Sequence, residues 1–355
     1  MKPAAPVTRT VFAAIWLDFR GMSYYHRVAR ECKRAGVARG DPLVEKVARS
    51  VMRLCAVSVD LDEIPHYYGI HGLPAPTGPG ANAVYELGLT RLEDWSRAEG
   101  LPLTLFAIGA DLASQANAAR LRTLVARGHE VANHTLDHLY ELTRRSRAEL
   151  TRQVEGGIRA IEAAVGVRPT GFRAPGYTVT DALCDVLEEL GVAYDSSVFP
   201  CPPYYFAKAA ALAAIRLRGR APSSILDTPA VLRAPTRPYR IGRPYWKPGR
   251  GLVELPVQVT RRLRLPFIGT SITLAGPSRA RFLTRGVVGE PLVNLELHGI
   301  DVLDADDGFA ELRGHQPDAR VPHARKLDAL SATVNVLKAA GYAFVRLDEA
   351  ARAFA

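Results

Sequence analysis

Five polar clusters in this 355-residue chain each stand where a short apolar run ends. In order they are Asp60-Leu-Asp62, His134-Thr-Leu-Asp-His138, Arg173-Ala-Pro-Gly176-Tyr177, Asp195-Ser-Ser197 and His298. In a β/α barrel the C-terminal ends of the strands converge on one rim, where the active site is built. The pattern therefore predicts that these side chains meet. Two carboxylates, three histidines and an arginine on one rim indicate a mononuclear metal hydrolase.

The rest of the chain alternates between strand and helix patterns. Short apolar runs predict strands over 54–60, 103–108, 130–132, 170–173, 192–194, 252–257, 292–297 and 342–347. Helical apolar spacing predicts helices over 83–97, 112–126, 146–165, 181–190 and 323–340, with a further helix at the C-terminus. Ser146, followed by Glu149, predicts a helix N-cap. Repeated strand–helix units favour a parallel α/β architecture.

The N-terminal 51 residues conform poorly to this pattern. They hold 10 Lys and Arg against 4 Asp and Glu, and so carry +6 of the chain's net charge of +10. We expect residues 1–51 to be an extension or a wrongly assigned start, and residues 52–355 to be the catalytic domain. Without the extension the chain is only modestly basic and shows no nucleic-acid motif, so we expect no nucleic-acid partner.

The expected compartment is the cytoplasm. The apolar run Val11–Leu17 is short, is followed by Asp18, and has no clear small-residue cleavage site after it, which makes secretion the weaker expectation. The four cysteines form neither a CxxC pair nor a disulfide framework, and we expect buried free thiols: Cys32, Cys55, Cys184 and Cys201.

Residues 200–251 break the rhythm with a Pro- and Arg-rich insertion. Between Lys208 and Arg250 it holds ten Lys and Arg and one acid, Asp227. A helix with a basic end is predicted over 206–220, and a long ordered loop over the remainder. Two interpretations stay open: a solvated basic surface, or a wall of the substrate site that favours a phosphate or another anion. Peripheral contact with the inner membrane surface is a related expectation.

The two histidines four residues apart are candidate metal ligands. On a helical turn, this spacing places both rings of His134 and His138 on one face. An Asp and two histidines with open positions form a ligand set that suits Zn²⁺ or a similar ion. One of the two carboxylates, Asp60 or Asp62, would belong to this ligand set. The other would then be free to act as general base. The alternative is a purely structural role, in which the two histidines are hydrogen-bonded within the fold and the aspartates cap a helix or lie in a loop.

The remaining clusters supply polar groups of other kinds. Arg173 can hold the general base by an ion pair, and Gly176 can bring its backbone N–H close to a developing oxyanion. His298 follows a strand, where a lone histidine is more often structural. Each residue by itself could have a purely structural role. Five such clusters in this order, each at the end of a strand, favour a catalytic site.

These clusters resemble the motifs of the polysaccharide deacetylase family, carbohydrate esterase family 4. That family runs through an acidic pair, an H-[ST]-x-x-H metal motif, an R-x-P motif, a fourth acidic motif and a late histidine. The flanks are similar too, in Leu103–Gly109 and Gly128–His134. The resemblance covers about residues 52–350 and is specific to about residue 200; beyond that, only Glu254-Leu-Pro256 and the His298 strand match well. It implies a distorted (β/α) barrel of seven or eight strands.

The resemblance also implies a role for each residue. Asp62, His134 and His138 would bind one divalent ion, with Zn²⁺ expected and Co²⁺ or Ni²⁺ as alternatives. Asp60 would take a proton from the attacking water and would be held by Arg173. The N–H of Gly176 would share the oxyanion with the metal. His298 would protonate the leaving amine, with Asp195 as its orienting carboxylate.

This chain departs from the family pattern in three places. Leu61 separates two aspartates that are usually adjacent, which is similar to the Asp-x-Asp branch. This spacing weakens the role implied for Asp60 more than the role implied for Asp62. The fourth motif lacks its usual tryptophan, which weakens the role implied for Asp195. The insertion is unlike the minimal catalytic domain and argues against a simple chitin-like polymer.

The function that this resemblance implies is metal-dependent removal of an N-acyl group, expected to be N-acetyl, from an amino sugar. The substrate would be an N-acylated sugar, oligosaccharide or lipid-linked glycan of the cell envelope. Three alternatives remain: a zinc protease with a loose H-x-x-E-H motif, a metal-independent amide or cyclic-ureide hydrolase or deformylase on the same scaffold, and an inactive sugar-binding barrel. Metal content separates the second from the implied function.

Overall fold

The computed structural model describes residues 53–76, 78–217, 219 and 224–355. Contacts between residues divide the chain into two units, 1–53 and 54–355. The predictions made for residues 1–51, including Cys32 and the Val11–Leu17 run, lie outside the described residues. Everything that follows concerns the second unit.

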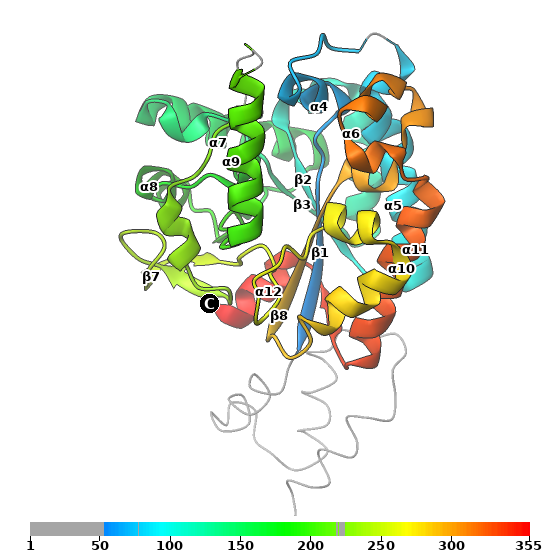
Figure 1. The fold of residues 1–355 in the computed structure, drawn as a ribbon. Helices are drawn as coiled ribbons and strands as arrows, with labels where there is room; N and C mark the ends of the chain where they lie inside the picture. The colour runs from blue at the N-terminus through cyan, green and yellow to red at the C-terminus, as the bar shows by residue number, and fades with distance from the viewer. Residues whose placement is uncertain (1–52, 77, 218, 220–223) are drawn as a thin grey trace, which may run out of the picture. The chain divides into compact units, whose positions relative to one another are not determined.

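One curled sheet forms the centre of this unit (Figure 1). Its strands follow the order β6-β7-β5-β4-β3-β2-β1-β8, and β9 pairs with β1 off this path. The strands are β1 (Leu54–Asp60), β2 (Leu103–Ala107), β3 (Glu130–Asn133), β4 (Gly171–Phe172), β5 (Tyr194–Asp195), β6 (Tyr239–Ile241), β7 (Pro248–Glu254), β8 (Leu292–His298) and β9 (Ala343–Val345). All pairs are parallel except β6 with β7.

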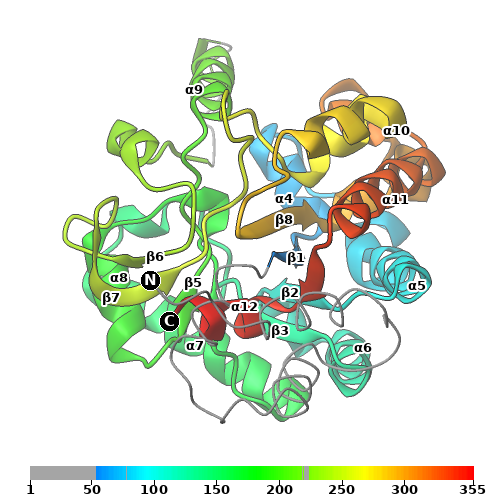
Figure 2. The same ribbon diagram turned by 90° about the horizontal axis from the view of Figure 1, so that it is seen from below.

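Helices surround the sheet, as the view along the strands shows (Figure 2). The α-helices are α4 (Ile64–Ile70), α5 (Leu89–Glu99), α6 (Gln115–Ala126), α7 (Arg147–Val165), α8 (Asp181–Glu189), α9 (Pro202–Leu217), α10 (Gly269–Arg285), α11 (His323–Ala339) and α12 (Leu347–Phe354). The predicted distorted β/α barrel is confirmed by this arrangement.

Among the described strands, the two edges of the sheet are β6 and β8, and the barrel is open there because no ladder joins them. The chain after β7 spans part of this gap. Gln258 N donates to Asn294 O at 3.3 Å, and Ile268 forms a single parallel bridge with Glu296 of β8. The segment 255–268 therefore brings the end of the insertion close to β8.

The central strand β1 explains why the rim is polar. All seven of its residues are buried, as expected for a parallel strand covered on both faces. Successive side chains alternate between faces, so Ser58 and Asp60 share one face while Val57 and Val59 share the other. Val57 and Val59 belong to the main apolar core, and the opposite face carries polar groups toward the site.

Several predicted elements agree closely with the structure. β1 has the predicted bounds, and Ser146 caps α7 by accepting a hydrogen bond from Glu149 N at 3.3 Å. The three described cysteines are free and buried. Among the described residues, no helix is both long enough and apolar enough to cross a bilayer.

Two parts of the fold differ from the sequence-based expectation. The insertion contains a β-hairpin of β6 and β7 where a loop was expected, and its helix α9 begins at Pro202 rather than near residue 206. Helix α10 was not predicted at all. Gly276 has a left-handed φ of 73° and is followed by Pro277, so the helix is kinked and its apolar periodicity is interrupted.

Candidate metal and acid–base site

Three predicted ligands meet at the C-terminal ends of β1 and β3. Asp62 Oδ1 lies 3.3 Å from His134 Nε2 and 3.2 Å from His138 Nε2. All three side chains are buried. Burial alone would raise the pKa of Asp62, but the adjacent His138 and His134 hold it well below its ordinary value. The carboxylate is therefore ionised, as a metal ligand must be.

A tight turn, and not a helix, brings the two histidines together, which corrects the helical expectation. Thr135 and His138 adopt left-handed φ values of 72° and 52°. Asn133 Oδ1 accepts from Thr135 N at 2.9 Å, and Thr135 Oγ1 accepts from His138 N at 3.0 Å. Side-chain hydrogen bonds thus stabilise a backbone that non-glycine residues seldom adopt.

A backbone carbonyl fixes the tautomer of His134. Its Nδ1–H donates to Arg173 O at 2.7 Å, so Nε2 carries the lone pair that faces Asp62. Arg173 thereby contributes to the site through its backbone as well as its side chain.

The chemistry of this donor set fits a divalent metal ion. Asp62 Oδ1, His134 Nε2 and His138 Nε2 are all buried, and none makes a hydrogen bond. They nevertheless lie within 4.8 Å of one another. Buried polar atoms without partners are costly, and a shared cation satisfies all three at once. Two imidazoles and one carboxylate are the ligands that Zn²⁺ commonly takes.

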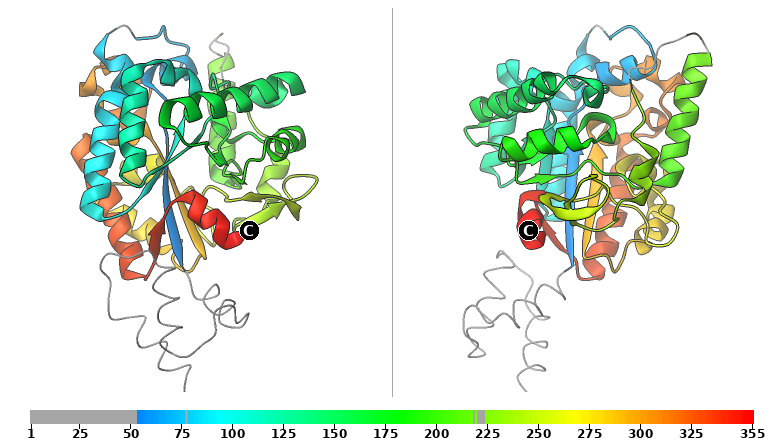
Figure 3. Two further views of the ribbon diagram at one scale, coloured as in Figure 1. Left: turned by 180° about the vertical axis from the view of Figure 1, so that it is seen from behind. Right: turned by 90° about the vertical axis from the view of Figure 1, so that its left-hand side faces the viewer.

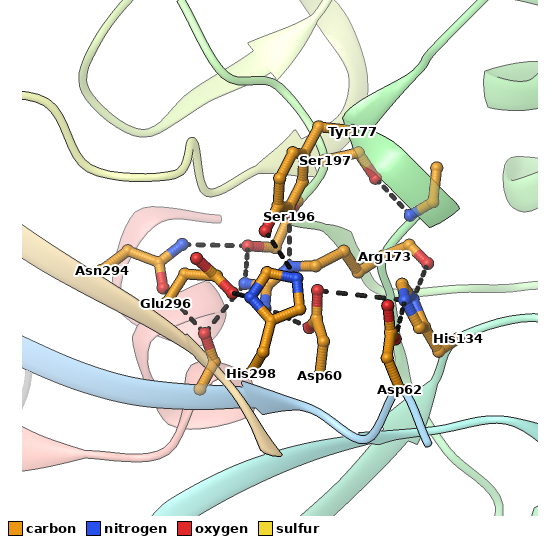
Figure 4. Close-up of polar contacts among 12 residues, drawn as sticks. Asp60, Asp62, His134, Arg173, Tyr177, Ser196, Ser197, Asn294, Glu296 and His298 are labelled. Atoms are coloured by element: carbon orange, nitrogen blue, oxygen red, sulfur yellow. Dashed lines mark hydrogen bonds and ion pairs between the residues drawn. The ribbon is translucent and has the colours of Figure 1, made fainter. Parts of the chain in front are cut away.

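Beside the metal cluster, Arg173 holds Asp60 inside a closed polar network (Figure 4). Its Nη1 donates to Asp60 Oδ1 at 2.7 Å, and its Nη2 donates to Ser58 Oγ and Ser196 Oγ at 2.9 and 2.8 Å. Its Nε donates to Ser196 O at 2.8 Å, and the guanidinium lies over the Phe106 ring at 4.1 Å. The buried arginine thus holds Asp60 in a fixed position.

The carboxylate partner of His298 is Glu296, not Asp195. His298 Nδ1 lies 2.9 Å from Glu296 Oε1 (Figure 4), and both residues come from β8. Burial would lower the pKa of His298, but Glu296 raises it well above the ordinary value. The other ring nitrogen, Nε2, lies 3.4 Å from the Tyr177 hydroxyl. His298 is therefore a protonated group with a fixed orientation.

Asp195 lies in a different buried pair. It is in register with Glu254 on the adjacent strand β7, and Ser197 Oγ donates to its Oδ1 at 2.5 Å. Burial raises the pKa of Asp195, and burial and the charge of Asp195 raise that of Glu254 well above its ordinary value. The Asp195 side chain is thus bonded to Ser197 beside Glu254. The carboxylate next to His298 is that of Glu296.

The turn that follows β4 carries Gly176 in a left-handed conformation. Gly176 has a left-handed φ of 63°, and a Cβ there would meet Tyr140 Cδ1 at 3.2 Å and Lys208 Nζ at 3.3 Å. The left-handed conformation therefore favours glycine, and a Cβ would press closely on Tyr140 and Lys208. Lys208 of α9 donates to Gly176 O at 3.0 Å, which links the insertion to this turn.

Sequence reasoning assigned no role to four residues of the network, although one of them, Ser196, lies in the Asp195–Ser197 cluster: Ser58, Ser196, Asn294 and Glu296. A signal for two of them was present, because polar residues recur with period two along β8, at 294, 296 and 298. That period places them on one face of a strand. Asn294 Nδ2 donates to Ser196 Oγ at 2.9 Å and so joins the strand to the arginine network.

Known proteins are similar to parts of this chain. The polysaccharide deacetylase family model matches residues 83–194. A peptidoglycan deacetylase from Helicobacter pylori is 26% identical over 159 residues, which are 43% of this chain and 52% of that protein. A chitooligosaccharide deacetylase from a Bradyrhizobium species is 42% identical over 76 residues, 21% of this chain and 33% of that protein. The chain thus spans about half of the length of the first relative and about one third of the length of the second.

Among solved structures, a Mycobacterium smegmatis protein described as a polysaccharide deacetylase has a TM-score of 0.50 and 18% identity, over 85% of this chain and 90% of that one. This likeness bears on the fold. The family match over residues 83–194 shows that this part of the chain is similar to polysaccharide deacetylases, and the likeness in fold extends over 85% of the chain. The family match includes His134, His138 and Arg173, while Asp60, Asp62 and His298 lie outside it.

Proposed function

We propose that this protein is a metal-dependent hydrolase that removes the N-acetyl group from an amino sugar. The observation that carries the proposal is the convergence of Asp62, His134 and His138 beside two charged pairs, Asp60 with Arg173 and His298 with Glu296. The names of the matched relatives, a peptidoglycan deacetylase and a chitooligosaccharide deacetylase, support the same reaction class.

The residues of the chain divide the reaction between them. A divalent ion at Asp62, His134 and His138, proposed to be Zn²⁺, would polarise the amide carbonyl and lower the pKa of water. Asp60 accepts a proton from the attacking water, and the hydrogen bond from Arg173 holds the Asp60 carboxylate in place. The N–H of Gly176 stabilises the charge that develops on the carbonyl oxygen.

His298 completes the transfer as the general acid. It donates its proton to the amine nitrogen as the C–N bond breaks, and the products are acetate and a free amine. Glu296 holds the ring and favours its protonated form, so we assign the orienting role to Glu296. Glu296 acts through His298 and is a positioning residue.

The proposed substrate is an N-acetylated oligosaccharide or lipid-linked glycan, and the proposed compartment is the cytoplasm. The basic insertion supports an anionic group near the sugar, because Lys208 reaches the Gly176 turn. The buried free thiols of Cys55, Cys184 and Cys201 are in keeping with a reducing compartment. Acetate release should be measured on chitooligosaccharides, peptidoglycan fragments and polyprenyl-phosphate sugars in parallel.

The decisive experiment combines metal content with turnover. Chelation should abolish acetate release, and Zn²⁺, Co²⁺ or Ni²⁺ should restore it. His138→Ala should lose both the bound metal and the activity, whereas His315→Ala, a change at an exposed histidine, should keep both. Full activity of a chelated, metal-free preparation would refute the metal mechanism and favour a metal-independent amide hydrolase.

A further inference from the structure

Exposed apolar side chains and positive charge are concentrated in one stretch of the chain. Five of the seven large apolar residues exposed in the described part of the chain fall between residues 202 and 285: Phe206, Leu217, Leu263, Leu274 and Phe282. The same stretch holds 16 Lys and Arg against two Asp and Glu, a net charge of +14. The whole chain carries +10, so the remainder is net negative.

Three elements bring these residues to one side of the barrel. Helix α9, the segment 255–268 and helix α10 face the viewer in Figure 1 and lie along the upper edge of Figure 2. The contacts agree with this placement. Cys201, just before α9, donates from Sγ to Arg264 O at 3.2 Å, and Arg261 N donates to Gly286 O, just after α10, at 3.0 Å. The turn at 260–265 therefore lies between the two helices.

The turn presents leucine at its tip. Thr260 closes it by accepting from Arg264 N at 3.0 Å and from Leu265 N at 2.9 Å. Leu263 is 72% exposed, next to the exposed Arg262. An apolar tip on a well-bonded turn is not explained by packing within the fold.

The end of α10 repeats this combination. Phe282 is 74% exposed, and its neighbours Arg281 and Arg285 are exposed as well. Neither arginine, nor Arg262, forms an ion pair within the described residues. The basic–apolar surface is defined by Phe206, Arg262, Leu263, Arg281, Phe282 and Arg285.

We propose that the basic–apolar surface docks on an anionic lipid bilayer. Unpaired arginines attract the anionic headgroups, and exposed Leu and Phe insert at the boundary between headgroups and acyl chains. A nucleic acid offers phosphates but no apolar phase for Leu263. A protein would need acidic and apolar groups at matching places, whereas an anionic bilayer offers both across its whole surface.

One element of this surface, α9, reaches the proposed site. Helix α9 stands out from the ring of helices (Figures 2 and 3) and contacts the site through Lys208, which donates to Gly176 O. Tyr204 of α9 also lies edge-on to Tyr177, with ring centroids 6.0 Å apart. The inference goes beyond the proposed reaction, since binding to lipid is measured without turnover.

The test is vesicle sedimentation with the full chain. Vesicles of phosphatidylcholine with 30% phosphatidylglycerol should bind the protein at low salt, and pure phosphatidylcholine vesicles should bind it at least about tenfold more weakly. Raising the ionic strength should weaken binding, because surface charges are screened. The double variant Leu263→Asp with Phe282→Asp should lose about tenfold or more in affinity for the anionic vesicles.

Val167→Asp is the matched control. Val167 is also an exposed apolar residue, 58% exposed, but lies between α7 and β4. The same substitution there should leave vesicle binding unchanged. If the double variant does not fold, as judged by circular dichroism, Arg281→Glu with Arg285→Glu takes its place. Wild-type binding by either folded variant, or equal binding to neutral and anionic vesicles, would overturn the proposal.

Discussion

At the scale of single residues, the orientation of His298 comes from its own strand. Glu296 lies two positions before it, on the same face of β8, and its carboxylate meets Nδ1 at 2.9 Å. The acidic motif residue Asp195 is instead paired with Glu254. The proposed general acid is thus oriented by a carboxylate of its own strand, and not by Asp195.

Glu296→Gln should slow catalysis and shift its pH dependence. His298 must be protonated to donate, and it is protonated below its pKa, so activity falls as pH rises through that pKa. Loss of the Glu296 charge lowers the pKa of His298. The basic limb of the pH–rate profile, where activity falls as pH rises, therefore moves to lower pH. We expect kcat to fall by about 10- to 100-fold with little change in KM. The pH–rate profile of both proteins measures this.

Asp195→Asn provides the comparison for that experiment. Its side chain lies in the pair with Glu254, so the basic limb should stay where it is in the wild type. If the basic limb moves in Asp195→Asn and stays fixed in Glu296→Gln, then Asp195 orients His298 and our assignment to Glu296 is wrong.

At the scale of elements, α7 packs directly against the turn that carries the metal histidines. A Cβ at Gly157 would lie 2.1 Å from Asn133 Oδ1 and 2.9 Å from the carbonyl carbon of Thr135. Asn133 Oδ1 is also the acceptor that stabilises Thr135 in its left-handed conformation. The close approach of helix and turn therefore requires glycine at this position.

Gly157→Ala should disturb the turn and weaken metal binding. Overpacking of this kind costs about 1–3 kcal/mol of unfolding free energy, measured by urea denaturation. Metal titration should show lower affinity, because the Asn133–Thr135 contact is displaced. Gly69→Ala in α4 is the control, since a Cβ there meets no atom within 4 Å and should be neutral or slightly stabilising. Equal stability of both variants would contradict the packing argument.

The success of sequence reasoning also differs by element. Apolar runs ending in polar groups predicted β1 and the rim, because parallel strands are buried on both faces and expose function only at their ends. The same focus on run ends overlooked Glu296, which lies within β8. The histidine turn was missed because it depends on two left-handed residues held by side-chain bonds, and α10 because Gly276-Pro277 interrupts its periodicity.

At the scale of the whole molecule, buried carboxyl groups make the fold sensitive to pH. Burial raises the pKa of Glu63, Glu130 and Asp301 to about 7 in each case. These groups take up protons in the folded state at pH values where the unfolded chain has released them. Folding stability therefore falls as pH rises from the ordinary carboxyl range toward 7.

Unfolding by urea should show this trend in the chelated protein. The free energy of unfolding is expected to be at least about 1 kcal/mol larger at pH 5 than at pH 8. Chelation removes the opposing influence of the metal, whose binding weakens when its histidine ligands are protonated. A chelated protein that is more stable at pH 8 than at pH 5 would show that these carboxyl groups are ionised in the fold.

The register of β1 with β8 has a consequence for how this scaffold can be altered. Asp60 is aligned with His298 across the two strands. Neighbouring strands lie about 4.8 Å apart, so the ladder, and not the surrounding loops, sets the spacing between the proposed proton acceptor and the proposed proton donor. Rim loops can therefore be exchanged to retarget the enzyme to another sugar while the two ends of the proton path keep their separation.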